Sequence, residues 1–234
     1  MAAVKTGGTS RREQARATRR RIVDAGYRLF ADDGYASATM DAIAAEAGVA
    51  VQTVYHVFNT KAVLLREVIT VAAAGQHDPP PEPAWMQEAL EATDGRRGLA
   101  VMIEHGISSS ARVAPLIAAI NAAASADPSF AEYWDASCEV RRTGTAALVA
   151  RLAARGQLRA GLGTQRAADI LYAIGSHETL SAFLTTCGWP LEDVKAWYYD
   201  LASGQLLADP AGAGLDVRSE RPTTGLSFDR IVGG

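Results

Sequence analysis

Apolar residues recur at three- and four-residue steps along most of the chain, and this spacing predicts α-helices. The first clear case predicts an amphipathic helix over about residues 12–32, because five small or apolar positions fall on one face: Ile22, Ala25, Gly26, Leu29 and Phe30. Gly34 ends this helix. No run of alternating β-branched residues competes with the helical pattern, so we expect an all-α fold.

Two short helices are predicted next, separated by a glycine. Thr39 is expected to cap a helix that buries Met40, Ile43, Ala44 and Ala47. Gly48 suits a left-handed turn, and a helix over about 50–57 follows, with Val54 and Phe58 buried. Helix, tight turn and second helix form a helix-turn-helix, whose second helix leaves a polar face free to enter a DNA groove. Gln52, Thr53 and His56 lie on that face.

The rest of the chain is divided by proline- and glycine-containing segments. A fourth helix is predicted from a Thr60 cap to Ala74, and the run "GQHDPPPEPAW" ends it. Beyond Trp85, with breaks at Gly95 and Gly98, helices are predicted over about 99–110, 115–125, 128–155, 165–187 and 190–207, and Asp127-Pro128 forms a cap for the third of these. The predicted domains are residues 1–75 for DNA binding, a Pro-rich linker over 76–84, a larger helical domain over 85–207 and a flexible tail over 208–234.

Composition is that of a globular protein. Of 234 residues, 48% are hydrophobic and 21% charged, which is enough apolar surface for a core. The Arg-rich beginning has no apolar segment of a secretion signal, and no run of about 18 apolar residues follows, so a cytoplasmic location without membrane contact is expected. Cys138 and Cys187 lie far apart and outside any metal-binding spacing, so neither a disulfide framework nor a metal site is predicted.

Charge is unevenly distributed along the chain. The net charge is −3, yet residues 1–75 hold ten Lys and Arg against seven Asp and Glu. Six arginines cluster before or in the first helix: Arg11, Arg12, Arg16, Arg19, Arg20 and Arg21. Such a patch favours contact with a polyanion, and we assign Arg19 and Arg20 as candidate phosphate contacts. A merely solvated, charged N-terminus is the alternative.

The segment around the predicted turn resembles a known family. Gly34-Tyr35, Thr39 and "IAAEAGVAVQTVYHVFNTKAVL" are similar to the DNA-binding domain of the tetracycline-repressor (TetR) family over about residues 16–70. The resemblance implies that Gln52 and Thr53 face bases, and that phosphates are contacted by Thr39, Tyr55, His56 and Lys61. Ala50 and Val57 depart from the family pattern, where a hydroxyl residue and an aromatic residue are common. The alternatives to these DNA contacts are that Tyr55 is partly buried and that His56 is a solvated surface residue.

In that family the remaining helices dimerise and enclose a small-molecule pocket. A dimer interface is predicted from small and apolar positions on the last two long helices: Leu171, Gly175, Thr179, Ala182, Phe183, Val194, Trp197, Tyr198 and Leu201. Ordinary core of one protomer is the alternative reading of this pattern. Effector contacts are predicted from the resemblance at Met102, His105, Phe130, Tyr133, Trp134 and Tyr172, which can equally be plain core.

The sequence contains little that would indicate another functional class. Hydrolase, metalloprotease and phosphate-loop motifs are not found, and the four histidines are widely spaced, so no catalytic residue, cofactor or metal is predicted. We therefore expect a homodimeric one-component regulator, a repressor in the simplest case, that binds a palindromic operator and is released by a small molecule. A DNA-binding architectural protein without an effector and a small helical enzyme are the alternatives.

Overall fold

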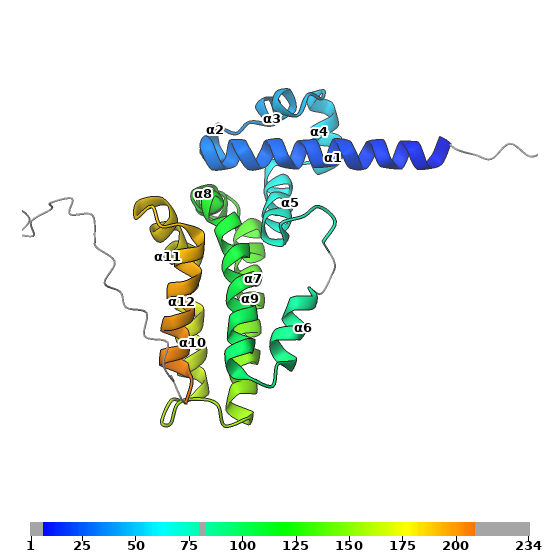
Figure 1. The fold of residues 1–234 in the computed structure, drawn as a ribbon. Helices are drawn as coiled ribbons and strands as arrows, with labels where there is room; N and C mark the ends of the chain where they lie inside the picture. Colours follow the sequence, from blue (N-terminus) through cyan, green and yellow to red (C-terminus); the bar gives the residue numbers. More distant parts are fainter. Residues whose placement is uncertain (1–6, 80–82, 209–234) are drawn as a thin grey trace, which may run out of the picture.

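The computed structural model describes residues 7–79 and 83–208, with side chains from Arg11 onward. These residues form α-helices, short 3₁₀ and π segments, and no strand beyond an isolated bridge between Leu158 and Leu207. The all-α prediction is therefore confirmed. Figure 1 shows two parts, with α1 lying across the end of a bundle of longer helices.

The N-terminal part contains five helices: α1 (Gly7–Asp32), α2 (Gly34–Ser37), α3 (Met40–Ala47), α4 (Val51–Phe58) and α5 (Lys61–Ala74). Thr39 and Thr60 cap α3 and α5 as predicted, because their side-chain oxygens accept hydrogen bonds from Ala42 N and Val63 N at 3.1 and 3.2 Å. α1 begins earlier than predicted. The one-turn helix α2 was missed, since four residues carry no readable helical period.

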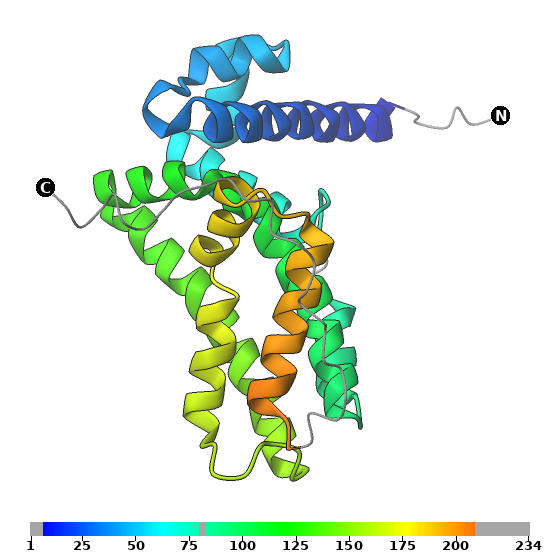
Figure 2. The same cartoon turned by 60° about the vertical axis from the view of Figure 1, so that its left-hand side comes forward.

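The second part contains α6 (Ala84–Glu91), α7 (Gly95–Val113), α8 (Ile117–Ala126), α9 (Pro128–Ala154), α10 (Thr164–Ile174), α11 (His177–Ser181) and α12 (Leu191–Leu206), with the short segments η1 (Ala114–Leu116) and η2 (Ala182–Thr186). Figure 2 shows α10 and α12 side by side along the bundle. Asp127 caps α9 through Ser129 N at 2.9 Å, as predicted. The predicted break at Gly98 is wrong, because this glycine lies inside α7.

The predicted continuous helix over 165–187 is also wrong, because α10 ends at Ile174 and α11 begins at His177. Tertiary contacts act on both sides of Gly175. The hydroxyl of Tyr198 donates to the carbonyl of Leu171, and Arg141 donates to the carbonyl of Gly175 at 2.9 Å. Ser176 then accepts a bond from Thr179 N at 3.2 Å and caps the next turn. These partners replace the helical hydrogen-bond ladder, which a sequence period cannot reveal.

Two hydrophobic cores run through the molecule. The first holds the buried faces of α1, α3, α4 and α5, and it continues into Val113, Leu116, Ile120 and Phe130 of the second part. The second core fills the bundle of α7, α9, α10 and α12. The start of the larger part is thus packed into the core of the N-terminal part. The division of the chain into functional domains stays a prediction, because apolar packing crosses the proposed boundary at residues 76–84.

The described ends of the Pro-rich linker are tied to α1. Arg20 pairs with Asp78 and His77 contacts Asp24, both at 3.0 Å. The predicted tail lies outside the described residues apart from Ala208. One described helical stretch, Gly95–Ala126, has the length and apolar character of a membrane span, with 44% of the window buried inside the protein. Core helices of soluble proteins share these properties, so this stretch is weak evidence for a span.

Candidate nucleic-acid interface and effector cavity

The turn between α3 and α4 is set by Gly48. Its φ of 64° lies in the left-handed region, and its N–H bonds back to the carbonyls of α3. Val54 and Phe58 are buried as predicted, which fixes the roll of α4. Ala50 at the cap of α4 makes no side-chain hydrogen bond, so the departure from the family pattern leaves the first N–H groups of α4 without that partner.

The free face of α4 presents the side chains predicted to meet DNA. Gln52, Tyr55 and His56 are exposed, and Thr53 is half-buried. Tyr55 is 49% exposed, which makes it one of the few large apolar side chains at the protein surface among the described residues. Thr39 is exposed at the start of α3. The predicted base-reading residues thus lie on α4 together with Tyr55 and His56, and Thr39 caps the preceding helix of the motif. We call these five residues the α4 face (Thr39, Gln52, Thr53, Tyr55 and His56).

The predicted phosphate-binding cations have partners inside the protein. Arg19 pairs with Glu67 at 3.0 Å and lies over the ring of Phe58, and Arg20 pairs with Asp78. Lys61 donates to the carbonyl of Tyr35 at 2.5 Å and lies over the Tyr35 ring, with its centroid 4.3 Å away. Burial lowers the pKa of Lys61 from its ordinary value. These side chains hold the N-terminal helices together, whatever they contribute to DNA binding.

Arg21 lies closest to the turn among the clustered arginines. A Cβ placed on Gly48 would lie 3.8 Å from its guanidinium, so the exposed Arg21 sits beside the turn between α3 and α4. No ion pair joins it to a carboxylate within the described residues. Arg28 in the next turns of α1 pairs instead with Glu46 of α3 at 2.8 Å. Sequence reasoning placed Arg21 in the basic cluster but did not single it out.

A large cavity opens in the second part of the molecule, with a volume of about 1310 Å³. It lies between α5, α6, α7, α9 and α10, and its wall includes five of the six predicted effector residues: Met102, His105, Tyr133, Trp134 and Tyr172. Pockets that hold small organic ligands commonly have volumes of about 300 to 1,000 Å³. The cavity is thus large enough for such a ligand, and its lining is mostly apolar and aromatic.

Phe130, the sixth predicted effector residue, does not line this cavity. Its side chain is fully buried in the first core, 5.8 Å from the ring of Tyr133. Phe130 follows the capped start of α9 and faces α5, whereas Tyr133 one turn later reaches the cavity. One turn along a helix separates the two environments, which the apolar character of both residues does not distinguish.

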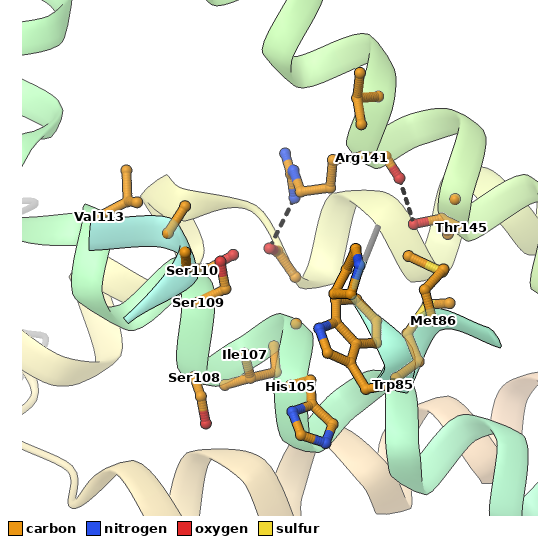
Figure 3. A pocket seen from close by; sticks show the side chains of 18 of the residues that line it. Trp85, Met86, His105, Ile107, Ser108, Ser109, Ser110, Val113, Arg141 and Thr145 are labelled. Carbon is orange, nitrogen blue, oxygen red and sulfur yellow. Dashed lines mark hydrogen bonds between the residues drawn. The ribbon is translucent and has the colours of Figure 1, made fainter. Parts of the chain in front are cut away.

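Several cavity residues were not predicted. Figure 3 shows Trp85 and Met86 near His105, with Arg141 above them in this view. The rings of Trp85 and His105 stack with centroids 5.4 Å apart and an interplanar angle of 9°. Ser108, Ser109 and Ser110 line another stretch of the wall. Trp85 follows directly on the proline run, where no helical period had begun, so its place in the wall depends on the docking of α6.

The ionisable groups of the wall are few. Arg112 donates to the carbonyls of Ala72 and Ala73 at 2.7 and 2.8 Å, which binds the last turn of α5. Burial lowers the pKa of His177 to about 4, and the charge of Arg141 acts in the same direction, so the imidazole is neutral at pH 7. Burial raises the pKa of the Cys138 thiol above its ordinary value, so it is not a thiolate at pH 7.

Four of the residues predicted for the dimer interface lie in the interior of this chain. Leu171, Gly175, Val194 and Tyr198 are buried within the helical bundle. A Cβ on Gly175 would lie 2.8 Å from the Tyr198 hydroxyl, so the glycine admits this tyrosine and not a second chain. The remaining predicted contacts are exposed or half-buried: Thr179, Ala182, Phe183, Trp197 and Leu201.

An aromatic cluster occupies the end of this region. The ring of Phe183 lies 4.9 Å from Trp189 and 4.7 Å from Trp197, measured between centroids. Trp189 is 39% exposed. Sequence reasoning treated Trp189 only as part of a helix break, although it completes the cluster. Within the described residues, no group of three or more His, Cys, Asp or Glu side chains gathers in a way that could hold a metal ion.

The segment that forms the helix-turn-helix is similar in sequence to known proteins. Residues 22–68 match the family described as bacterial regulatory proteins, tetR family. A curated relative is an uncharacterized helix-turn-helix transcriptional regulator, TtgW of Pseudomonas putida, 42% identical over 64 residues. That match covers 27% of this chain and 46% of the relative, so the chain spans about half the length of this curated relative.

Solved structures resemble the chain over most of its length. They include the fatty acid degradation regulator FadR from Bacillus halodurans, at 19% identity and a TM-score of 0.65, where the match covers 80% of this chain and 95% of that one. A SmeT–triclosan complex is 21% identical with a TM-score of 0.63, and the match covers 88% of this chain and 99% of that one. A putative transcriptional regulator from Saccharomonospora viridis in complex with choline is 16% identical with a TM-score of 0.64, and the match covers 82% of this chain and 98% of that one. At these identities the likeness concerns the fold.

Proposed function

We propose that this chain is a member of the tetR family of bacterial regulatory proteins, similar to it over residues 22–68, and acts as a cytoplasmic homodimer that binds a palindromic operator and is released from it by a small molecule. The proposed output is repression, without catalysis. The observation that carries the proposal is the helix-turn-helix of α3 and α4, which lies within the matched family segment and exposes the α4 face. Amide side chains such as Gln52 read base edges, and hydroxyl groups bind phosphates.

Dimerisation is proposed because one short recognition helix reads few base pairs. A two-fold dimer reads two half-sites about 34 Å apart and gains the affinity of both. The partly exposed residues Phe183, Trp189, Trp197 and Leu201 support an interface at the η2–α12 end, since exposed aromatic clusters commonly mark protein contacts. The buried residues of α10 and α12 then serve to hold this surface rigid.

Release by a ligand is proposed because the cavity wall is bonded directly to α5, the helix that follows the recognition helix. Two cavity residues make these bonds: Arg112 holds the carbonyls of Ala72 and Ala73, and the Tyr133 hydroxyl donates to the carbonyl of Arg66 at 3.2 Å. The carbonyl of Arg112 also accepts the hydroxyl of Tyr27 on α1, at 2.9 Å. A ligand that moves α7 or α9 therefore acts on α1 and α5, the helices that pack against the helix-turn-helix of α3 and α4.

Arg112→Met is expected to weaken the coupling between ligand and operator. The variant loses two hydrogen bonds to α5 but keeps an apolar stem, so a ligand found by thermal-shift screening should still bind while its effect on operator affinity falls several-fold. Operator affinity is measured with and without ligand by fluorescence anisotropy. Arg97→Met on the same helix is the control, because that guanidinium pairs with exposed Glu88 instead. An unchanged coupling factor in Arg112→Met contradicts this route.

The first experiment selects bound sequences from a random double-stranded DNA pool and then measures affinity for the selected site across salt concentrations. Enrichment of a two-fold symmetric site supports the proposed dimeric regulator. Linkage also requires that ligand and operator weaken each other by the same factor. Weak, salt-sensitive binding without an enriched sequence contradicts base reading by the α4 face, and an effector-free architectural role then becomes the better account.

A further inference from the structure

Arg141 brings an unpaired positive charge to the wall of the cavity. It lies on α9, half-buried, and one of its guanidinium nitrogens donates to the carbonyl of Gly175 at 2.9 Å. Its Nε is buried and has no hydrogen-bond partner, and no carboxylate of the described residues forms an ion pair with it. A guanidinium with neither a charged partner nor full hydration is costly beside an apolar cavity, so an anion there gains a strong interaction.

The other formal charges of the described wall are already engaged. Glu88 forms its ion pair with Arg97, at 2.6 Å, and not with Arg141. Arg112 donates to two carbonyls of α5. Arg141 is therefore the one charged side chain of the described wall whose charge no carboxylate or helix end of α5 compensates. The charge of Arg141 also acts to lower the pKa of Cys138, His177 and Tyr198, which locates positive potential at this end of the cavity.

His177 stands at the same end as a second unsatisfied group. Its side chain is 9% exposed, it lines the cavity, and its Nδ1 is buried without a hydrogen-bond partner. The imidazole is neutral at pH 7 and repels no anion through a charge of its own, while a backbone hydrogen bond to Ser110 engages its N–H. Its ring packs against Trp134 with centroids 5.5 Å apart, which limits its rotation.

The rest of the wall suits an apolar body. Trp85, Met86, His105 and Ile107 come together on the side of the cavity that Figure 3 shows below Arg141. A cationic ligand is disfavoured, because Arg141 and Arg142 already lie over the face of Tyr172, 4.1 and 4.3 Å from its centroid. The face of Tyr172, at the Arg141 end of the cavity, is thus occupied by the protein's own guanidinium groups.

We infer that the effector is an amphipathic organic anion, with a carboxylate bound by Arg141 and an apolar body along Trp85, Met86 and His105. The planar fork of Arg141 matches a carboxylate, and its buried Nε is a donor without a partner. This inference rests on the proposed function in one respect only, namely that the cavity is an effector site. It concerns the chemistry of that site and not the DNA surface.

Two matched sets of probes test the inference by isothermal titration calorimetry at pH 7.5 with the full chain. One set is decanoate, decanamide and decyltrimethylammonium; the other is 2-naphthylacetate, 2-naphthylacetamide and 2-naphthylmethyl-trimethylammonium. The acid is expected to bind at least tenfold more tightly than its amide in one set or both, and the ammonium compound least tightly. Equal binding of acid and amide in both sets, or no binding of either acid, overturns the inference.

Variants assign the preference to residues. Arg141→Met should remove the acid preference and leave amide binding within about threefold, whereas Arg151→Met, at an exposed position of the same helix outside the cavity wall, should change neither. Arg141→Lys keeps the charge without the fork and should restore part of the preference, which a purely structural role at Gly175 would not predict. Circular dichroism and thermal unfolding verify the fold of each variant.

Failure of this inference and failure of the proposed function are separable. A protein that selects a palindromic site but shows no acid preference keeps the regulator proposal and loses the anion site. A protein that prefers acids through Arg141 but selects no DNA sequence keeps the anion site and loses the proposed function. An acid preference that survives in Arg141→Met also overturns the assignment, because the charge then comes from elsewhere.

Discussion

Tyr55→Ala is expected to weaken binding to the selected operator more than tenfold. Tyr55 stands 49% exposed on α4, where its hydroxyl can donate to a phosphate and its ring adds contact area. Hydrogen bonds to charged groups contribute about 1.5 to 3 kcal/mol each, and both protomers of a dimer lose one. Affinity is measured by fluorescence anisotropy over a range of salt concentrations, where loss of a phosphate contact should flatten the salt dependence.

Three further variants separate the contributions to DNA binding. Tyr55→Phe removes the hydroxyl and keeps the ring, so it isolates the phosphate bond. Gln52→Ala should alter the ranking of operator variants, because Gln52 is assigned to bases. Val140→Ala removes a still more exposed apolar side chain far along α9 and should change nothing. If Tyr55→Ala and Val140→Ala bind the operator alike, Tyr55 makes no phosphate contact.

Gly98→Ala is expected to destabilise the protein by about 1 to 3 kcal/mol, the range typical of overpacked sites. A Cβ at Gly98 would lie 2.9 Å from the backbone carbonyl oxygen of Ala89 and 3.2 Å from a methyl group of Leu148. This carbonyl belongs to the backbone of α6, which cannot move away from the added methyl group as a flexible side chain could. Because α6 carries Trp85 and Met86 into the cavity wall, the substitution should also disturb ligand binding.

Gly106→Ala on the same helix is the matched control for this prediction. A Cβ there meets no atom within 4 Å, and alanine favours helix by up to about 1 kcal/mol over glycine. Urea unfolding followed by circular dichroism should therefore show Gly106→Ala equal to or more stable than the parent chain. A Gly98→Ala variant as stable as Gly106→Ala would contradict the close packing of α6 on α7.

These predictions draw on residues that the sequence reveals to different degrees. Local patterns suffice for the helix-turn-helix, since Thr39, Gly48 and the buried pair Val54 and Phe58 act through neighbours within a few residues. The same holds for the Asp127 cap of α9. Because Gln52 and His56 lie opposite the buried positions of one short helix, their exposure on the α4 face follows from helical geometry, whereas the exposure of Tyr55 was implied by the family resemblance.

The cavity and its charges follow from contacts between distant parts of the chain. Whether Phe130 or Tyr133 reaches the cavity depends on how α9 docks on α5. Arg141 and Arg142 are adjacent and chemically alike, yet one lines the cavity and the other pairs with Glu139 at the surface. Similarly, the internal partners of Arg19 and Arg20 lie 48 and 58 residues away in sequence.

The sequence by itself therefore determined the helical class, the recognition helix and its exposed face, because each rests on spacing and capping within one or two helical turns. Only the tertiary structure decided where α10 ends, because Tyr198 and Arg141 bind the carbonyls of Leu171 and Gly175 from other helices. It likewise buried four predicted interface residues inside the helical bundle and placed an unpaired guanidinium in the cavity wall. Such outcomes depend on which helices meet, and a periodic pattern identifies the apolar face of a helix without identifying what covers it.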